Sequence, residues 1–203
     1  EGSTPLIHAC LKGRLNTVNV LLAVDGIEVN YRKDDGGTAL YTSCACGHLK
    51  VVEMLLAVGG IQVNQANHEE TTPLWIASGN GHSKVVEMLL AVDGIQVNQA
   101  TNKGTTPLNA ACKHGHSKAV EMLLAVDGVQ VNQAANNGMT ALHIACKNGH
   151  SKVVEMLLAV DGVQVNQAAN KGTTPLNYAC HQGHSKVVEM LLAVDGVQVN
   201  QAA

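Results

Sequence analysis

Apolar residues along this chain follow a helical spacing, and the whole pattern recurs every 34 residues. In the fourth copy of the pattern, Val120, Leu123 and Leu124 stand at positions i, i+3 and i+4, which places them on one face of a helix. A fixed period in this range is typical of stacked repeat proteins. We therefore expect one array over residues 1–203, with repeats at 2–35, 36–69, 70–103, 104–137, 138–171 and 172–203.

Each repeat carries the signals of two helices joined by a tight turn. In the fourth repeat, Thr106 is a favourable N-cap residue, and Pro107 suits the first helical position because its missing N–H needs no partner there. Gly115 suits a left-handed C-cap, so the first helix is expected to end at about His114. The second helix is expected to open at His116-Ser117.

The remainder of each repeat predicts a turn and a loop. Asp127-Gly128 marks a turn after the second helix, and residues 129–132 alternate briefly between apolar and polar. A polar run through Asn136-Asn137-Gly138 then predicts an extended loop before the next helix pair. The unit is therefore helix, tight turn, helix and projecting loop, which makes the fold class all-α.

Composition limits the function classes. A unit of 34 residues is too small to bury an adequate core alone, so each repeat must pack on its neighbours. With no Phe and one Trp, the core is expected to be aliphatic. A net charge of −3 with 14% charged residues argues against nucleic acid, and no apolar run approaches the roughly 20 residues that cross a bilayer. We expect a soluble piece of a longer polypeptide, without membrane insertion.

Five of the six cysteines stand at one repeat position and are expected to be small buried groups. Equivalent positions in packed helical repeats lie about 8–10 Å apart, beyond the roughly 7 Å limit between the Cα atoms of a disulfide. Cys46 and Cys44 point in different directions on a helix, and no second pair completes a zinc site. We therefore expect free thiols, no metal, and a reducing, cytoplasmic compartment. The five equivalent residues are Cys10, Cys44, Cys112, Cys146 and Cys180.

The fifth repeat carries a recognisable motif. Residues 140–145 read Thr-Ala-Leu-His-Ile-Ala and are followed by Gly149-His150, Val153-Val154, Leu157-Leu158 and Val165-Asn166. This pattern resembles an ankyrin repeat, and the match recurs in all six units. The resemblance implies a solenoid of stacked helix-turn-helix units with projecting β-turn loops. It also implies a protein-binding module, without enzymatic activity, that uses its loops and first helices as a concave face.

The chain departs from the family in its period, because the usual ankyrin period is 33 and each unit here has one residue more. The extra residue falls between Leu-Leu and Val-Asn, as in residues 126–130. We expect it in the turn after the second helix, where it widens a loop on the convex side without disturbing the stack.

Comparison of the repeats separates the positions that stay constant from those that vary. Residues 82–94, 150–162 and 184–196 are identical, and residues 116–128 differ from them only at Ala119. Variation gathers instead in the loops and first helices, which the family resemblance places on the concave face. The candidate protein-binding residues are Tyr31, Arg32, Lys33, Asp34, Asp35, Tyr41, Thr42, His68, Glu69, Glu70, Trp75, Ile76, Asn102, Lys103, Asn109, Lys113, Asn136, Asn137, Met139, Ile144, Lys147, Asn170, Lys171, Asn177, Tyr178 and His181.

All four aromatic residues, Tyr31, Tyr41, Trp75 and Tyr178, occupy varying positions and none belongs to the repeated core pattern. Tyr and Trp are enriched at interface hot spots, because rigid rings bury a large area at little entropic cost. Tyr41 and Trp75 lie on successive repeats, so we expect their rings to be neighbours at the centre of an N-terminal half-site. The alternative is that each ring packs on the adjacent loop as part of the fold.

The charges beside these rings are acidic, which would suit a partner that carries Lys or Arg next to an apolar anchor. The acidic residues are Asp34, Asp35, Glu69 and Glu70.

Histidines form a ladder at the repeat spacing. The family resemblance implies that they are structural, hydrogen-bonding turn backbone where the two helices of a repeat meet. It implies a structural role for His143 as well, whereas His68 and His181 are candidate contacts. The ladder residues are His48, His82, His116, His150 and His184.

Catalysis finds no support, because no nucleophile has a base and an orienting acid at a motif spacing, and the glycines punctuate turns. No cofactor is expected. The family resemblance leaves one modification open: Asn30, with Glu28 two positions before it, is a candidate substrate of asparaginyl hydroxylases.

The two ends of the array differ. Asn16, Thr17 and Asn19 make the first repeat a partial polar cap, whereas the last repeat keeps its apolar Val187 and Val188. We expect fraying over residues 184–203, or end-to-end stacking there. Besides a binding module, the chain could be a structural spacer or elastic segment of a longer array, or a selected or engineered scaffold.

Overall fold

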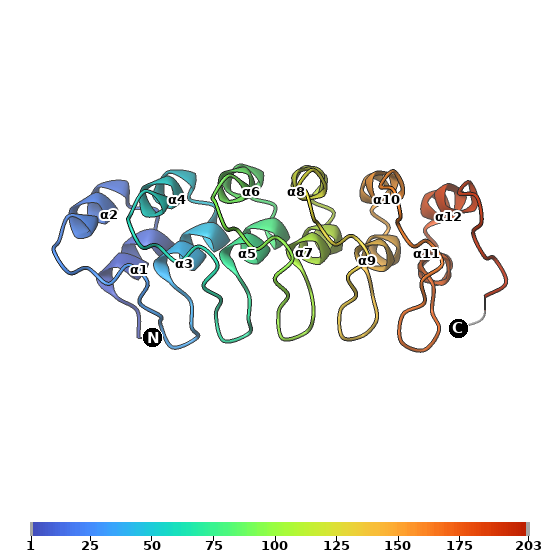
Figure 1. The fold of residues 1–203 in the computed structure, drawn as a ribbon, viewed down its shortest axis with the longest axis horizontal. Coiled ribbons are helices and arrows are strands. Elements are labelled where there is room, and N and C mark those ends of the chain that lie inside the picture. The colour runs from blue at the N-terminus through green and yellow to red at the C-terminus, as the bar shows by residue number, and fades with distance from the viewer. Residues whose placement is uncertain (1, 202–203) are drawn as a thin grey trace.

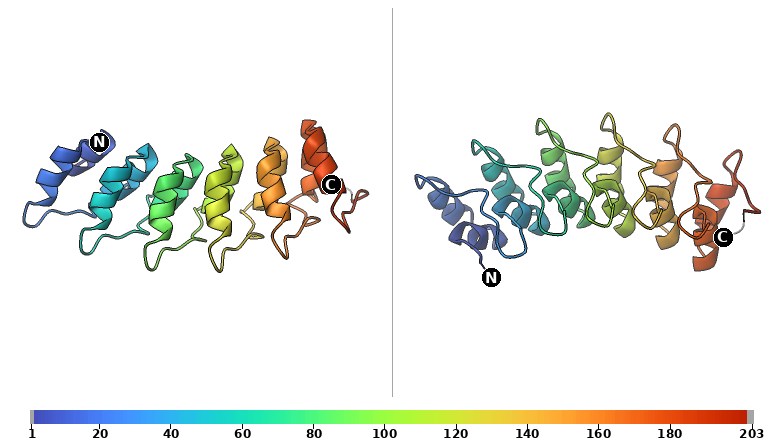
Figure 2. Two further views of the ribbon diagram at one scale, coloured as in Figure 1. Left: turned by 90° about the horizontal axis from the view of Figure 1, so that it is seen from above. Right: turned by 60° about the horizontal axis from the view of Figure 1, so that its bottom comes forward.

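The computed structural model describes residues 2–201, and this part of the chain holds twelve α-helices and no β-strand. The helices form two parallel rows, with the loops projecting from the row of first helices, and Figure 2 shows that the array is curved. The inner row (Figure 1) consists of α1 (Pro5–Leu11), α3 (Ala39–Cys46), α5 (Pro73–Gly79), α7 (Pro107–His114), α9 (Ala141–Asn148) and α11 (Pro175–Gln182). The outer row consists of α2 (Leu15–Leu22), α4 (Leu49–Leu56), α6 (Ser83–Leu90), α8 (Ser117–Leu124), α10 (Ser151–Leu158) and α12 (Ser185–Leu192).

The inner helices begin where the sequence predicts. In α7 the hydroxyl of Thr106 accepts a hydrogen bond from the backbone N–H of Asn109 at 3.2 Å, and Pro107 is the first helical residue. Gly115 ends the helix in the left-handed conformation, at φ 72°. A glycine stands there because it adopts positive φ without a Cβ clash. The predicted helix over residues 107–114 is confirmed.

The core is one aliphatic layer between the two rows, as predicted. Leu108 of the inner row and Val120 and Leu123 of the outer row are at most 2% exposed, and their equivalents in other internal repeats are buried alike. Burial of each such side chain contributes about 1.5–3 kcal/mol. Since consecutive inner helices pack on each other as well as on their own outer helix, every repeat shares its core with both neighbours.

The histidine ladder joins neighbouring repeats. Each ring binds through Nε2 a backbone carbonyl 37 residues earlier, in the last turn of the preceding inner helix, at 3.1–3.2 Å. His116, for example, binds the carbonyl of Gly79. The structural role is confirmed, but the acceptor is a carbonyl at the end of the preceding repeat's inner helix and not the turn backbone that we expected. A Cβ on Gly81 would lie 2.5 Å from the His116 ring, so the glycine before each junction makes room for the next repeat's histidine.

Asparagines form a second ladder, on the turn that follows each outer helix. The side-chain amide of Asn98 donates to the carbonyl of Gly128 at 2.8 Å and accepts from the N–H of Gln130 at 2.9 Å. Asn30, Asn64, Asn132 and Asn166 make the same pair of bonds to the repeat that follows each. The turn that contains the extra residue is therefore held by the preceding repeat.

The projecting loops are also linked tip to tip. Each loop closes on itself, as where the N–H of Thr101 donates to the carbonyl of Thr105 at 3.0 Å. The N–H of Asn102 then donates to the carbonyl of Glu69 on the preceding tip at 3.2 Å, and His68, Asn136 and Asn170 repeat this contact. The loops are consequently ordered relative to one another.

All six cysteines are free thiols. Four of the five equivalent residues are buried, and burial raises the pKa of the Cys146 thiol to about 12. Cys180 is exposed, contrary to expectation. The face of α11 that carries it has no further inner helix packed on it within residues 2–201.

Both ends of the array expose apolar side chains, so the expected contrast between them is only partial. Asn16, Thr17 and Asn19 of α2 are exposed, but Leu15 and Val20 of the same helix are 42% and 67% exposed. On the last repeat Leu192 is 52% exposed and Val199 60% exposed. Fraying at this end remains a prediction.

Candidate functional site

The candidate residues gather on one surface, formed by the inner helices and the projecting loops, which we call the loop face. The loop tips are exposed, as are Lys113, Lys147 and His181 near the ends of their inner helices. The half-buried candidates are Lys33, Tyr41, Trp75, Ile76, Asn177 and Tyr178. The exposed candidates on the loops are Tyr31, Arg32, Asp34, Asp35, His68, Glu69, Glu70, Asn102, Lys103, Asn136, Asn137, Asn170 and Lys171.

Four candidates offer little side-chain area to a partner: Thr42, Asn109, Met139 and Ile144 are each at most 9% exposed. Asn109 varies among the repeats for a local reason, since its Oδ1 accepts a hydrogen bond from the Thr106 hydroxyl at 2.7 Å. The expectation that these residues present a broad contact surface is corrected, although Asn109 and Ile144 still line a hollow of the loop face.

Tyr41 lies at the acidic end of the loop face. Its hydroxyl accepts a hydrogen bond from Nδ2 of Asn67 at 3.4 Å, which joins α3 to the next loop. Burial raises the pKa of Tyr41, and the carboxylates of Asp35 and Glu69 raise it further. The potential around this ring is therefore negative.

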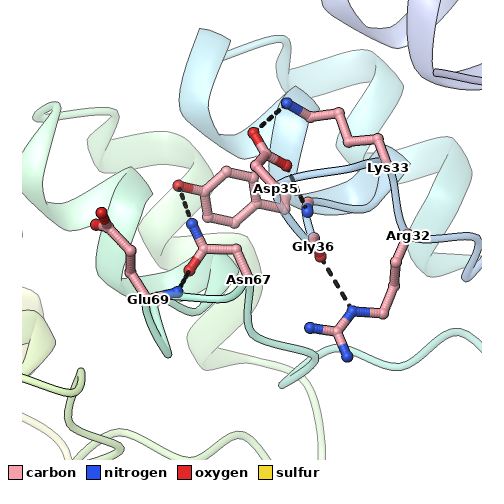
Figure 3. Close-up of polar contacts among 8 residues, drawn as sticks. Arg32, Lys33, Asp35, Gly36, Asn67 and Glu69 are labelled. Atoms are coloured by element: carbon pink, nitrogen blue, oxygen red, sulfur yellow. Dashed lines mark hydrogen bonds and ion pairs between the residues drawn. The ribbon is translucent and has the colours of Figure 1, made fainter. Parts of the chain in front are cut away.

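The first two loop tips are braced by polar contacts (Figure 3). Arg32 donates to the carbonyl of Gly36 at 3.3 Å and to the carbonyl of Ala66 on the next loop at 3.1 Å. Lys33 forms an ion pair with Asp35. The Arg and Lys of this loop are thus already engaged within the protein, and part of the acidic charge is neutralised.

Trp75 is held by the loop that follows it. Its indole Nε1 donates to the carbonyl of Thr105 at 3.1 Å. The aromatic ring contacts of residues 2–201 join His143 to Tyr178 and His114 to His116, and do not include Tyr41 with Trp75. The expectation that these two rings are neighbours is therefore wrong: each ring turns towards the loop on its C-terminal side.

A hollow of about 180 Å³ opens beside Trp75, between the third and fourth repeats. Its walls come from three consecutive inner helices, α5, α7 and α9, and from two loop tips. The lining residues are Glu69, Thr71, Trp75, Thr101, Asn102, Lys103, Thr105, Asn109, Ala110, Lys113 and Ile144. No sequence motif signals this hollow.

Residue size changes along the array at the positions that line this hollow. Residue 110 is Ala, whereas the equivalent residues of the repeats before and after are Ile76 and Ile144. Trp75 is in turn the largest residue at its own repeat position. The large ring of Trp75 and the small side chain of Ala110 together leave a cavity at this repeat junction.

A second aromatic cluster lies near the C-terminal end. Tyr178 meets the ring of His143 edge to face, with centroids 6.1 Å apart, and Nζ of Lys147 lies 5.6 Å from the Tyr178 centroid. His143 is completely buried, and its Nδ1 accepts from the N–H of Thr140 at 3.2 Å. Its structural role is confirmed.

Larger hollows of about 440 and 460 Å³ lie between successive outer helices, α8 with α10 and α10 with α12. Both are shallow grooves lined by equivalent residues, such as Lys118 and Met156 in one and Lys152 and Met190 in the other. A partner would find the same surface twice, so these grooves define no unique site. We therefore place the candidate site on the loop face.

Within residues 2–201, no group of three or more His, Cys, Asp or Glu side chains is arranged to hold a metal ion. Over the same residues, no helix has the length and apolarity that crossing a membrane requires.

Comparison with known proteins agrees with this architecture. The family model described as ankyrin repeats, three copies, matches residues 1–67, 59–135 and 125–203. The chain therefore belongs to the ankyrin repeat family. Search of the curated proteins finds no match.

Two solved structures are similar. An ankyrin repeat domain from Acinetobacter baumannii is 28% identical, with a TM-score of 0.81, over 93% of this chain and 96% of that one. The ankyrin repeat domain of human ASB11 is also 28% identical, with a TM-score of 0.83, over 98% of this chain and 86% of that one. The fold is an all-α ankyrin solenoid, which is a protein-interaction architecture.

Proposed function

We propose that the loop face binds a protein or peptide partner, with Tyr41 and Trp75 as its main anchors and without enzymatic activity. One observation carries the proposal: the positions that vary among otherwise identical repeats lie together on one face, and most of them are exposed. Residues that maintain the stack have no need to vary, so the variation supports a role outside the stack.

Large half-buried rings in an otherwise aliphatic protein support the anchor assignment. Trp75 is fixed by its bond to Thr105, so little side-chain entropy remains to be lost on binding. Hot-spot residues of this type contribute about 2 kcal/mol or more to affinity. The free cysteines support a reducing compartment, so we expect a cytoplasmic partner.

The test is capture of partners from cell extract by the wild type and by a Tyr41→Ala/Trp75→Ala variant. We expect the double variant to lose the specific partner, and Trp75→Ala alone to weaken a purified partner's binding by about 2 kcal/mol or more. Thermal unfolding should change little, because Trp75 lies outside the aliphatic core. If Trp75→Ala melts the array instead, the ring belongs to the fold and the proposal is wrong.

A structural spacer within a longer array is the second candidate. The regular histidine and asparagine ladders favour it, because they fix each repeat on the next in the same way. The exposed Leu192 and Val199 would then receive a further repeat or a second molecule. Equal rates of replacement and synonymous change at the varying positions of the coding DNA would support the spacer, and sedimentation at rising concentration tests the end-to-end contact.

A further inference from the structure

Two residue choices shape the hollow at this repeat junction. Trp75 is the largest residue at its repeat position, and Ala110 leaves out the side chain that Ile76 and Ile144 supply in the adjacent repeats. The cavity therefore lies where Trp75 forms one wall and Ala110 lies at the base.

Its volume of about 180 Å³ suits one inserted side chain. An apolar cavity of about 150 Å³ accepts a benzene-sized molecule, so Leu, Ile or Met would fit here. Trp75, Ala110 and Ile144 provide the apolar surface. The indole is already held by Thr105, so the wall is formed before a ligand arrives.

The two sides of the hollow carry opposite charge. Glu69 and Glu70 stand at the tip on the N-terminal side, and Lys103 at the next tip with Lys113 on α7 stand on the other. All four are exposed, and none takes part in the ion pairs within residues 2–201. The bond from Asn102 N–H to the Glu69 carbonyl holds these tips beside each other.

The neighbouring charges shift the pKa values of two side chains on the loop face. On the acidic side, burial followed by the charges of Asp35 and Glu69 raises the pKa of Tyr41. On the basic side, burial followed by the charges of Lys113, His116 and His150 lowers the pKa of His114. The loop face therefore changes sign across the Trp75 hollow.

We propose that the hollow takes one aliphatic side chain of an extended peptide whose basic residues lie towards Glu69 and Glu70 and whose acidic residues lie towards Lys103 and Lys113. The proposal rests on the proposed function of the loop face. Packed repeats lie about 8–10 Å apart, and an extended chain rises about 3.3 Å per residue, so about three residues span one repeat. The charged groups are therefore expected about three residues to either side of the aliphatic one.

The probes are synthetic eleven-residue peptides of about this spacing, with Leu at the centre, Lys at one end and Glu at the other. Matched peptides replace the Leu by Ser, or carry Lys at both ends or Glu at both ends. Trp75 is the only tryptophan of the chain and lines the hollow, so its fluorescence reports occupancy directly. We expect the bipolar Leu peptide to bind at least about tenfold more tightly than each matched peptide, and to weaken as salt rises.

Ala110→Ile is the decisive variant, because it fills the hollow with the residue that the adjacent repeats already use. It should lower affinity for the bipolar Leu peptide about tenfold or more and leave the thermal unfolding unchanged. Lys118→Glu, in an outer groove, is the matched control and should bind as the wild type does. A Lys103→Glu/Lys113→Glu variant should bind the peptide with Lys at both ends more tightly than the bipolar Leu peptide. This variant tests the proposal independently if Ala110→Ile fails to fold.

Equal binding of the Leu and Ser peptides, or an Ala110→Ile protein that folds and binds like the wild type, would overturn this inference. The proposed function has separate criteria, since it fails if the Tyr41→Ala/Trp75→Ala variant retains its cellular partner or if Trp75→Ala melts the array. A partner lost by that double variant but kept by Ala110→Ile would mean that the loop face binds without using the hollow.

Discussion

The outer helices and the loop face differ in how much their copies vary, although both belong to the same repeated segment. Helices α6, α10 and α12 have the same eight residues, whereas no two of the six loop-and-inner-helix segments are alike. An outer-helix residue such as Val120 packs within the shared core, so a change there affects more than one repeat. A loop-tip side chain in solvent has no such neighbour and is free to differ. The residues that the copies share are therefore those that pack the repeats on one another.

Variation alone does not identify function, however. Residue 143 is His where the equivalent residues 109 and 177 are Asn, yet all three side chains bond to the Thr that caps their helix. Asn and His thus meet the same local requirement, which is a hydrogen bond with the hydroxyl of the capping Thr. Candidate contacts are better drawn from the varying residues that remain exposed, such as Lys103 and Lys113.

The largest expected difference between the two regions is in stability. Leu123→Ala removes a completely buried side chain from the outer row and should cost about 2–5 kcal/mol by leaving a cavity. Lys113→Ala on the loop face should stay within about 0.5 kcal/mol of the wild type. Urea denaturation of both variants checks the pair, and equal costs would contradict the division between core and loop face.

The asparagine ladder supplies a control within the chain. Asn98→Ala should cost about 1–3 kcal/mol, because it leaves the Gly128 carbonyl and the Gln130 N–H without their partner. Asn200, at the same position of the last repeat, makes no hydrogen bond within residues 2–201, so Asn200→Ala should be close to neutral. Similar thermal shifts for the two variants would show that the amide acts within its own repeat.

Acid should distinguish His143 from its asparagine equivalents. Burial lowers the pKa of His143 below its ordinary value of about 6.5, so the unfolded state takes up a proton first. Stability is therefore fully present above about pH 6.5 and declines as the pH falls towards the lowered pKa. His143→Asn, the residue found at positions 109 and 177, should reduce the loss of melting temperature between about pH 7.5 and pH 5. An unchanged loss would assign the acid sensitivity to the other histidines.

The smallest effect is expected at a loop tip. Glu70 has φ 59° at a position where the five other repeats have glycine. A side chain in the left-handed region costs about 1–2 kcal/mol, and Glu70→Gly removes this cost. Glycine also loses more backbone freedom on folding, which cancels part of the gain, so the variant should stabilise the array by up to about 1 kcal/mol. Differential scanning calorimetry measures the gain, and the variant also removes one charge from the acidic side of the hollow.

Much of the architecture could be predicted because its signals are local. Thr106, Pro107 and Gly115 specify a helix start and a helix end within ten residues, and the period of Val120, Leu123 and Leu124 specifies which side is buried. The aliphatic core and the six free thiols follow from the same comparison of repeats. Contacts between repeats could not be read in this way. The carbonyl that His116 binds is 37 residues away, and backbone groups leave no trace in sequence.

The sequence by itself determined the repeat, the two helices of each unit and the face on which the copies differ, because periodicity and capping act over a few residues. The tertiary structure alone decided which varying residues are accessible. It buried Asn109 and Ile144, turned the rings of Tyr41 and Trp75 towards separate loops, and opened a hollow over Ala110. These outcomes depend on the sizes of side chains contributed by three neighbouring repeats at once, and a cavity exists only once those repeats are packed together.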